Sequence, residues 1–234
     1  MMKQIFLLTG WGVGASVLQP LAAELKQLNY RVILSPLPCS NKSEEWLTLL
    51  AQSVPEQSYW VGWSLGGQLL SALTQCSAAR CLGLITLATN PCFTASDSWQ
   101  TAMPNTSFER FTASFKSQPT QTIQRFLQLI AQGCPESKSL VKAINATLPE
   151  LDIQQSLAGL GLLGSLNVVA DLQNFTGKQL HILAKQDVLV PKHVSEAIQS
   201  HVPHAKIDIL PNTGHGFVIT DPKQTALKIH AFFR

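Results

Sequence analysis

The first part of the chain alternates between two hydrophobic patterns. Continuous apolar runs of the length of buried strands occupy residues 5–9, 31–34, 58–62 and 80–88. Between these runs, apolar residues recur at the spacing of amphipathic helices over 16–29, 44–53 and 65–75, and we expect Ser43 to be the N-cap of the second of these helices. This order predicts βαβ units and therefore an α/β fold, with a mostly parallel sheet that carries helices on both faces.

The alternation stops between about 104 and 172, where helical spacing continues without a convincing strand. It then resumes, with strands expected over 179–184 and 206–210 and helices over 192–200 and 222–233. A helical insert between two strands of an α/β sheet is typical of a lid. We therefore predict a core made of residues 1–103 and 173–234 and a helical lid made of residues 104–172.

Composition and charge exclude several classes of protein. Apolar residues make up 45% of the 234 positions, which is enough to bury a large core and excludes a disordered chain. The net charge of +3 is too small and too evenly spread for a nucleic-acid surface. No apolar run reaches the length of a transmembrane helix, and the apolar run at the start is too short for a signal peptide. We therefore expect no nucleic-acid partner and no membrane association.

The five cysteines are odd in number and include no CxxC pair. This pattern favours reduced thiols in a cytoplasmic protein over disulfides or a zinc site. We predict no metal site and no organic cofactor, because the sequence contains neither a cluster of metal-ligand residues nor a phosphate-binding glycine loop. We also expect the protein to be a monomer.

The strongest chemical signal is a serine between glycines. The segment Gly62-Trp63-Ser64-Leu65-Gly66 has the GxSxG pattern, with an expected strand before it and an expected helix after it. In this context the serine occupies a sharp strand-to-helix turn that projects its hydroxyl from the sheet edge, and the start of the helix favours developing negative charge. We predict that Ser64 is a nucleophile. The alternative is an ordinary serine in a glycine-rich turn.

A serine nucleophile needs a base and a carboxylate that orients the base. His215 lies in a turn-rich segment after the last expected strand, and Asp187 follows the strand expected over 179–184. The order Ser64, Asp187, His215 is that of α/β-hydrolases. The rival carboxylates are Asp171, at the end of the insert, and Asp208, inside an expected strand, and Asp187 could itself be a turn or capping residue.

In the reaction that this triad performs, Ser64 attacks an acyl carbon while His215 takes its proton and Asp187 holds the imidazole. Two backbone N–H groups must then stabilise the oxyanion. We expect one from Leu65, which follows the nucleophile, and the other from Trp11 in the Gly10-Trp11-Gly12 turn.

Beyond this triad and its chain order, the sequence resembles the α/β-hydrolase superfamily over nearly its whole length. More narrowly, it is similar to the family of pimeloyl-[acyl-carrier protein] methyl ester carboxylesterases of biotin synthesis. The segments that carry the resemblance are Gly10-Trp11-Gly12, the GxSxG turn (the elbow), Pro91-Cys92-Phe93-Thr94-Ala95 with Trp99, Arg125-Phe126-Leu127-Gln128-Leu129, and Leu189-Val190-Pro191. The narrower match rests mainly on the segment from Pro91 to Trp99 and on residues 125–129.

The resemblance implies a substrate, the methyl ester of pimeloyl-acyl carrier protein, and its hydrolysis to pimeloyl-acyl carrier protein and methanol. It implies that an acyl channel is lined by Phe126, Leu127, Gln128, Leu129 and Ile130. It also implies that the reacting end of the substrate contacts Trp11, Ser64, Leu65 and His215.

The family's lid meets its acidic carrier through basic side chains. Between residues 110 and 142 this chain has five basic residues against Glu136 alone, a local balance of +4. We expect Arg125, Lys138 and Lys142 to contact the carrier, although a scattered solvated face would show the same charges.

Two other functions remain open. A general short-chain carboxylesterase or thioesterase would use the same triad, because acyl transfer depends little on the leaving group. A non-catalytic binding protein with a hydrolase fold is the second alternative, and the intact triad argues against it.

Overall fold

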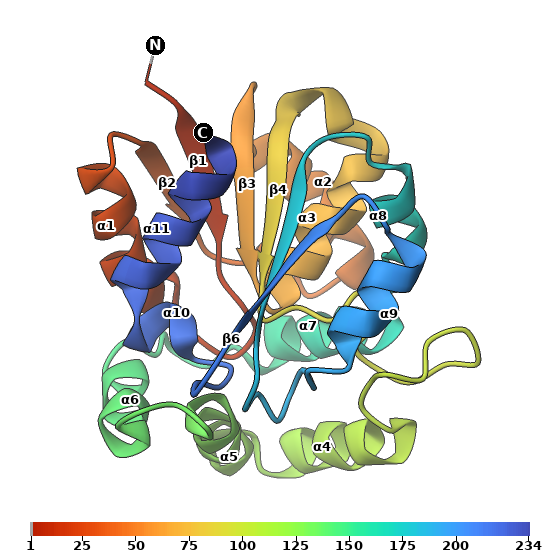
Figure 1. Cartoon of the computed structure of the whole chain (residues 1–234). Helices are drawn as coiled ribbons and strands as arrows, with labels where there is room; N and C mark the ends of the chain where they lie inside the picture. The colour runs from red at the N-terminus through yellow and green to blue at the C-terminus, as the bar shows by residue number, and fades with distance from the viewer. Residues whose placement is uncertain (1) are drawn as a thin grey trace.

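The core of the fold is one six-stranded sheet with the strand order β2-β1-β3-β4-β5-β6 (Figure 1). The computed structural model describes residues 2–234. Every neighbouring pair is parallel. The strands are β1 (Gln4–Leu8), β2 (Arg31–Ser35), β3 (Ser58–Trp63), β4 (Cys81–Leu87), β5 (Gln179–Ala184) and β6 (Lys206–Leu210). The predicted α/β fold is confirmed.

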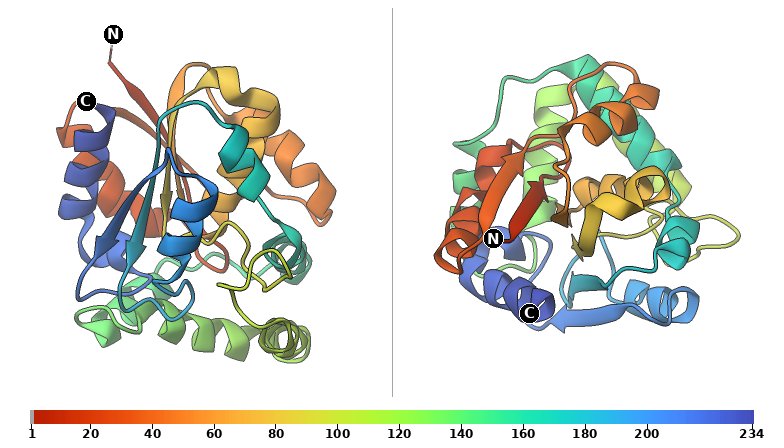
Figure 2. Two further views of the ribbon diagram at one scale, coloured as in Figure 1. Left: turned by 45° about the vertical axis from the view of Figure 1, so that its right-hand side comes forward. Right: turned by 90° about the horizontal axis from the view of Figure 1, so that it is seen from above.

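The central strands are apolar on both sides because helices cover both faces of the sheet. Every residue of β5 is buried, as are residues 5–8 of β1. One face carries α1 (Gln19–Gln27), the short α10 (Phe217–Thr220) and α11 (Pro222–Phe233). The other face carries α2 (Trp46–Ser53), α3 (Leu65–Ser77), α8 (Val169–Asn174) and α9 (Val194–His201) (Figure 2).

Between β4 and β5 the chain leaves the sheet and forms a helical insert. Its helices α4 (Asn105–Ser117), α5 (Pro119–Ala131), α6 (Ser137–Asn145) and α7 (Ile153–Ser165) lie together beyond the carboxyl ends of the strands, while both termini lie at the opposite end (Figure 1). Helix α8 follows and packs against α3. The insertion occurs where the sequence predicts it. Its division from the core at residues 104 and 172 stays a prediction.

Two local details differ from expectation. Ser43 is not a helix cap: it lies inside the short 3-10 helix η2 (Ser43–Glu45), and α2 begins after Glu45 without a side-chain cap bond. The helix expected over 16–29 is divided into the 3-10 helix η1 (Ala15–Leu18) and α1. Pro20, in the first turn of α1, explains the division, because proline has no N–H to continue an α-helical ladder backwards. The remaining short element is η3 (Ala78–Arg80).

A buried histidine lies inside the sheet. His181 in β5 is 1% exposed, and its ring nitrogens lie 2.7 Å from Thr86 Oγ1 and 3.3 Å from Gln179 Oε1. Burial, together with the nearby charge of His204, lowers the pKa of His181 to about 4. The folded protein therefore holds this imidazole neutral under conditions in which an unfolded chain would protonate it.

This pKa predicts acid destabilisation. The histidine takes up a proton below about pH 6.5 in the unfolded chain but only below about pH 4 in the folded protein. The stability that depends on a neutral His181 is therefore fully present above pH 6.5 and is lost as the pH falls from 6.5 to 4. Between pH 7.5 and 5, the free energy of unfolding should fall by about 2 kcal/mol more in the wild type than in His181→Gln. Urea unfolding at the two pH values measures this difference. The exposed His193→Gln is the control, and a wild-type slope in His181→Gln would contradict the prediction.

Candidate active site

Ser64 occupies a strained turn between β3 and α3. Its backbone has φ 56° and ψ −122°, a conformation that residues with a side chain rarely adopt. Two contacts hold it: the Ser64 N–H donates to Leu87 O at 2.9 Å, and Thr89 Oγ1 donates to Ser64 O at 3.0 Å. The strand, turn and helix that the GxSxG pattern requires are all present.

The two glycines of the pattern allow close backbone contact. A Cβ atom on Gly62 would lie 2.5 Å from the Gly66 carbonyl, and one on Gly66 would overlap the carbonyl oxygen of Thr9, just after β1. A side chain at either position would therefore push β1, β3 and α3 apart. The tight turn at Ser64 depends on this absence of side chains.

Asp187 and His215 meet at the same edge of the sheet. Asp187 follows β5, His215 lies between β6 and α10, and His215 Nδ1 lies 2.8 Å from Asp187 Oδ2. The other carboxylate oxygen of Asp187 accepts from the N–H groups of Leu189 at 2.8 Å and Val190 at 3.0 Å. A carboxylate held in this way accepts from Nδ1–H and orients the opposite ring nitrogen, Nε2.

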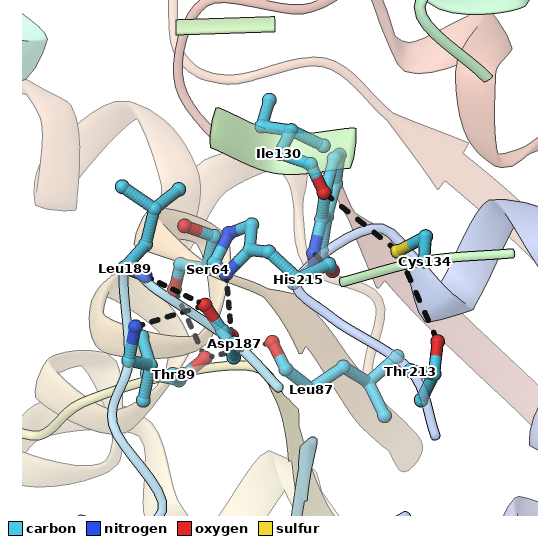
Figure 3. Close-up of polar contacts among 11 residues, drawn as sticks. Ser64, Leu87, Thr89, Ile130, Cys134, Asp187, Leu189, Thr213 and His215 are labelled. Atoms are coloured by element: carbon cyan, nitrogen blue, oxygen red, sulfur yellow. Dashed lines mark hydrogen bonds and ion pairs between the residues drawn. The ribbon is translucent and has the colours of Figure 1, made fainter. Parts of the chain in front are cut away.

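Figure 3 shows Ser64 and Asp187 beside the ring of His215. His215 is 1% exposed, and within residues 2–234 its Nε2 has no hydrogen-bond partner. A buried ring nitrogen without a partner is costly, and here it lies on the side of the ring away from Asp187. The rival carboxylates are elsewhere: Asp208 bonds Lys228 at 2.6 Å, and Asp171 lies on α8.

The residues expected to stabilise an oxyanion lie beside Ser64. The turn after β1 runs so close to the elbow that a Cβ on Gly10 would lie 3.1 Å from Ser64 Cβ. Leu65 is the first residue of α3, where a backbone N–H has no partner inside the helix. The turn at Gly10-Trp11 and the start of α3 therefore flank the serine.

The fold agrees with the comparison to known proteins. The model of the "Alpha/beta hydrolase family" matches residues 5–228. The chain belongs to the alpha/beta hydrolase family.

Hydrolases of known name resemble it over most of its length. The pimeloyl-[acyl-carrier protein] methyl ester esterase of Serratia marcescens is 30% identical over 241 residues, covering 98% of this chain and 93% of that protein. The protein of the same name from Shewanella woodyi is 28% identical over 225 residues, covering 91% and 87%. Among solved structures, an esterase from Exiguobacterium antarcticum superposes with a TM-score of 0.87 at 14% identity, covering 99% of this chain and 91% of that one, which shows the shared fold.

The Trp11 side chain connects the turn after β1 to the helical insert. Its Nε1–H donates to Ser156 O of α7 at 2.8 Å. Its ring packs edge-on against Phe126 of α5 at 5.0 Å and Phe111 and Phe115 of α4 at 5.7 and 5.5 Å between centroids. These contacts leave the Trp11 side chain 3% exposed. They hold the Gly10-Trp11 turn, which lies beside Ser64, against the insert.

The residues expected along an acyl channel do not share one environment. On α5, Phe126, Leu127 and Ile130 are buried, Leu129 is half-buried and Gln128 is exposed. A cavity of about 480 Å³ lies beside them, between the turn at residues 11–15, the loop after β2 and the insert. From α5 it is lined by Thr120, Ile123 and Gln124, not by residues 126–130. Its charged lining residues are both acidic, Glu150 and Asp152.

The basic residues expected to contact a carrier are on the outside of the insert. Arg125 on α5 and Lys138 and Lys142 on α6 are exposed, and α5 and α6 pack side by side. Within residues 2–234, none of the three forms an ion pair. Their charges are therefore available to a partner in solution.

Residues 2–234 contain neither a cluster of metal-ligand side chains nor a helix that could cross a membrane. No group of three or more His, Cys, Asp or Glu residues there could hold a metal ion. None of the helices over residues 2–234 has the length and apolar character needed to span a bilayer.

The sequence pattern does not predict a contact that Trp63, the residue before Ser64, makes with His215. The indole of Trp63 donates to His215 O at 3.2 Å, and its ring centroid lies 5.6 Å from that of His215. Trp63 is 1% exposed. The variable position of the GxSxG pattern gives no signal for this contact, which forms only when β3 and the loop after β6 come together.

The Trp63 contact predicts a graded loss of activity. Trp63→Phe removes the hydrogen bond to His215 O, and since one such bond contributes about 1 kcal/mol, kcat should fall roughly three- to tenfold with little change in KM. Steady-state hydrolysis of a p-nitrophenyl ester measures both constants. Trp60→Phe is the matched control, because the Trp60 indole is also buried but donates to Ser58 Oγ. Equal losses in the two variants would contradict a role for Trp63 in holding His215.

Proposed function

We propose that this protein is a serine ester hydrolase whose catalytic residues are Ser64, His215 and Asp187. The observation that carries the proposal is the buried 2.8 Å hydrogen bond between His215 and Asp187 beside a serine in a strained strand-to-helix turn. This combination orients a base toward a nucleophile without help from a cofactor. Membership of the hydrolase family supports the same chemistry.

The three residues have distinct roles in the proposed mechanism, and His215 acts first as base and then as acid. His215 Nε2 removes the proton of Ser64 Oγ as the oxygen attacks the ester carbon, and Asp187 stabilises the imidazolium that forms. The proton then passes to the departing alcohol. Water repeats the sequence on the acyl-enzyme and regenerates Ser64. The backbone N–H groups of Leu65 and Trp11 stabilise the oxyanion, each contributing about 3 kcal/mol to the transition state.

The substrate that we propose is the methyl ester of pimeloyl-acyl carrier protein, hydrolysed to pimeloyl-acyl carrier protein and methanol. The names of the similar proteins from Serratia and Shewanella support it. The exposed positive charges of Arg125, Lys138 and Lys142 also support it, since an acyl carrier protein is acidic and long-range attraction speeds its encounter with a basic face. In this proposal the helical insert is the lid that receives the carrier.

The electrostatics of the cavity beside Trp11 fit an uncharged chain. Glu150 and Asp152 line it, whereas no lysine or arginine does. A negatively charged part of a ligand would be repelled there, whereas an uncharged acyl segment would not. Ser64 and His215 do not line this cavity, so it would take a part of the substrate away from the reacting ester.

The role of Ser64 predicts a large loss on substitution. Ser64→Ala removes the attacking oxygen, so turnover should fall about 10⁴- to 10⁶-fold, and a fluorophosphonate probe should no longer label the protein. The exposed Ser53→Ala is the control. A loss below tenfold would exclude Ser64 as nucleophile. Unlabelled wild-type protein would favour a non-catalytic binding protein.

The basic face predicts a difference between two kinds of substrate. Arg125→Glu with Lys138→Glu should lower kcat/KM for the carrier-bound ester about tenfold or more at low salt, while hydrolysis of p-nitrophenyl butyrate stays unchanged. The pair Lys26→Glu and Lys192→Glu makes the same charge change on exposed sites of the core.

Equal effects on both substrates would contradict carrier docking on the insert and favour a general short-chain carboxylesterase or thioesterase. Complementation of a biotin auxotroph that lacks its methyl ester esterase tests the substrate itself. The wild type should restore growth and Ser64→Ala should not.

A further inference from the structure

The turn between α5 and α6 touches the loops of both proposed triad partners of Ser64. We call Gln132, Gly133 and Cys134 the α5–α6 turn. It belongs to the helical insert, yet it lies against the loop that carries His215 and the loop that carries Asp187. Figure 3 shows Cys134 and Ile130 of this region beside Thr213 and His215.

On the histidine side, the contacts are made mostly by backbone. The N–H of Gly216 donates to the carbonyl oxygen of Ile130, in the last turn of α5, at 3.0 Å. Gly214 lies so close to Gln132 O that a Cβ atom there would overlap it. Thr213 Oγ1 donates to Cys134 Sγ at 3.8 Å. Residues on both sides of His215 are thus held by the end of α5 and the turn after it.

On the aspartate side, the contact is made by Gly133. Its φ is +78°, which favours glycine, and a Cβ atom there would lie 2.7 Å from Gln186 Cβ and overlap Gln186 O. Gln186 directly precedes Asp187, and its N–H donates to Thr213 O at 3.0 Å. The two loops are therefore joined to each other and share one support.

Helix α5 connects this support to the turn at Trp11. Near its middle, the Phe126 ring lies 3.2 Å from the Cβ position of Gly12 and 5.0 Å from the Trp11 ring, centroid to centroid. Its carboxyl end carries the α5–α6 turn. One helix of the insert thus spans the distance from the proposed oxyanion donors to the histidine and aspartate loops.

We infer that the α5–α6 turn is a positioning element that sets the geometry of the His215–Asp187 pair through Gln186, Thr213 and Gly216. The inference rests on the proposed function. The turn contacts the loops rather than the reacting atoms, so its loss should slow the chemical step more than it weakens substrate binding. Displacements of about 1 Å remote from the chemistry can cost two orders of magnitude in rate.

The first test is Gly133→Ala. The added methyl must displace Gln186, so kcat for a p-nitrophenyl ester should fall about tenfold or more while KM stays within about twofold. The downfield proton resonance of the His215–Asp187 hydrogen bond, identified by its loss in His215→Gln, should shift or disappear. Gly161→Ala on α7 is the matched control, because a Cβ there meets nothing within 4 Å. It should keep the wild-type kcat and resonance.

A second variant covers the case in which Gly133→Ala does not fold. Cys134→Ala removes only the sulfur that lies behind Thr213 and Gly216, so the protein should fold and show a roughly threefold lower kcat with a shifted resonance. Cys81→Ala is its control. Cys81 is 8% exposed against 9% for Cys134, but it begins β4 at the opposite end of the sheet.

The possible outcomes distinguish a failure of the positioning role from a failure of the proposed hydrolase function. If Gly133→Ala and Cys134→Ala match their controls in kcat and in the resonance, the turn has no positioning role. The same conclusion follows if activity falls only in proportion to the unfolded fraction. If the wild type shows no Ser64-dependent hydrolysis or labelling, the proposed function fails. The resonance, which needs no substrate, then still decides whether the turn positions the pair.

Discussion

Parallel pairing of all six strands is the constraint on which the rest of this structure depends. Because every strand runs in the same direction, every carboxyl end lies at one edge of the sheet. Trp11 after β1, Ser64 after β3, Asp187 after β5 and His215 after β6 are thereby brought from distant parts of the sequence to one place. An antiparallel strand would send one of these residues to the opposite edge.

The helical insert completes this edge through packing. Trp11 makes three aromatic contacts with α4 and α5, and such pairs contribute roughly 0.5–1.5 kcal/mol each beyond their buried area. The insert also holds the loops that carry Asp187 and His215 through the α5–α6 turn. A segment that covers the site therefore also contacts the elements from which the site is built.

The insert presents charges of opposite sign to two environments. Its outer face carries Arg125, Lys138 and Lys142, all exposed, whereas Glu150 and Asp152 line the cavity between the insert and the core. In the proposed function these fields have separate roles. The positive face attracts an acidic carrier from a distance, and the acidic lining favours an uncharged segment of the substrate over a negatively charged one.

The sequence by itself determined the α/β architecture, the position of the insert and the serine turn, because these depend on local periodicity and on glycines near one another in the chain. The strands over 179–184 and 206–210 and the helix over 222–233 have the predicted bounds. The start of α2 was not predictable from Ser43, because a capping preference does not decide whether a 3-10 turn precedes the helix. Only the tertiary structure decided that Trp63 donates a hydrogen bond to His215 O and that Gly133 lies against Gln186. It also decided which residues of α5 line the cavity. These contacts join positions far apart in the sequence, and their distances are set by how the insert packs on the sheet, which no local pattern encodes.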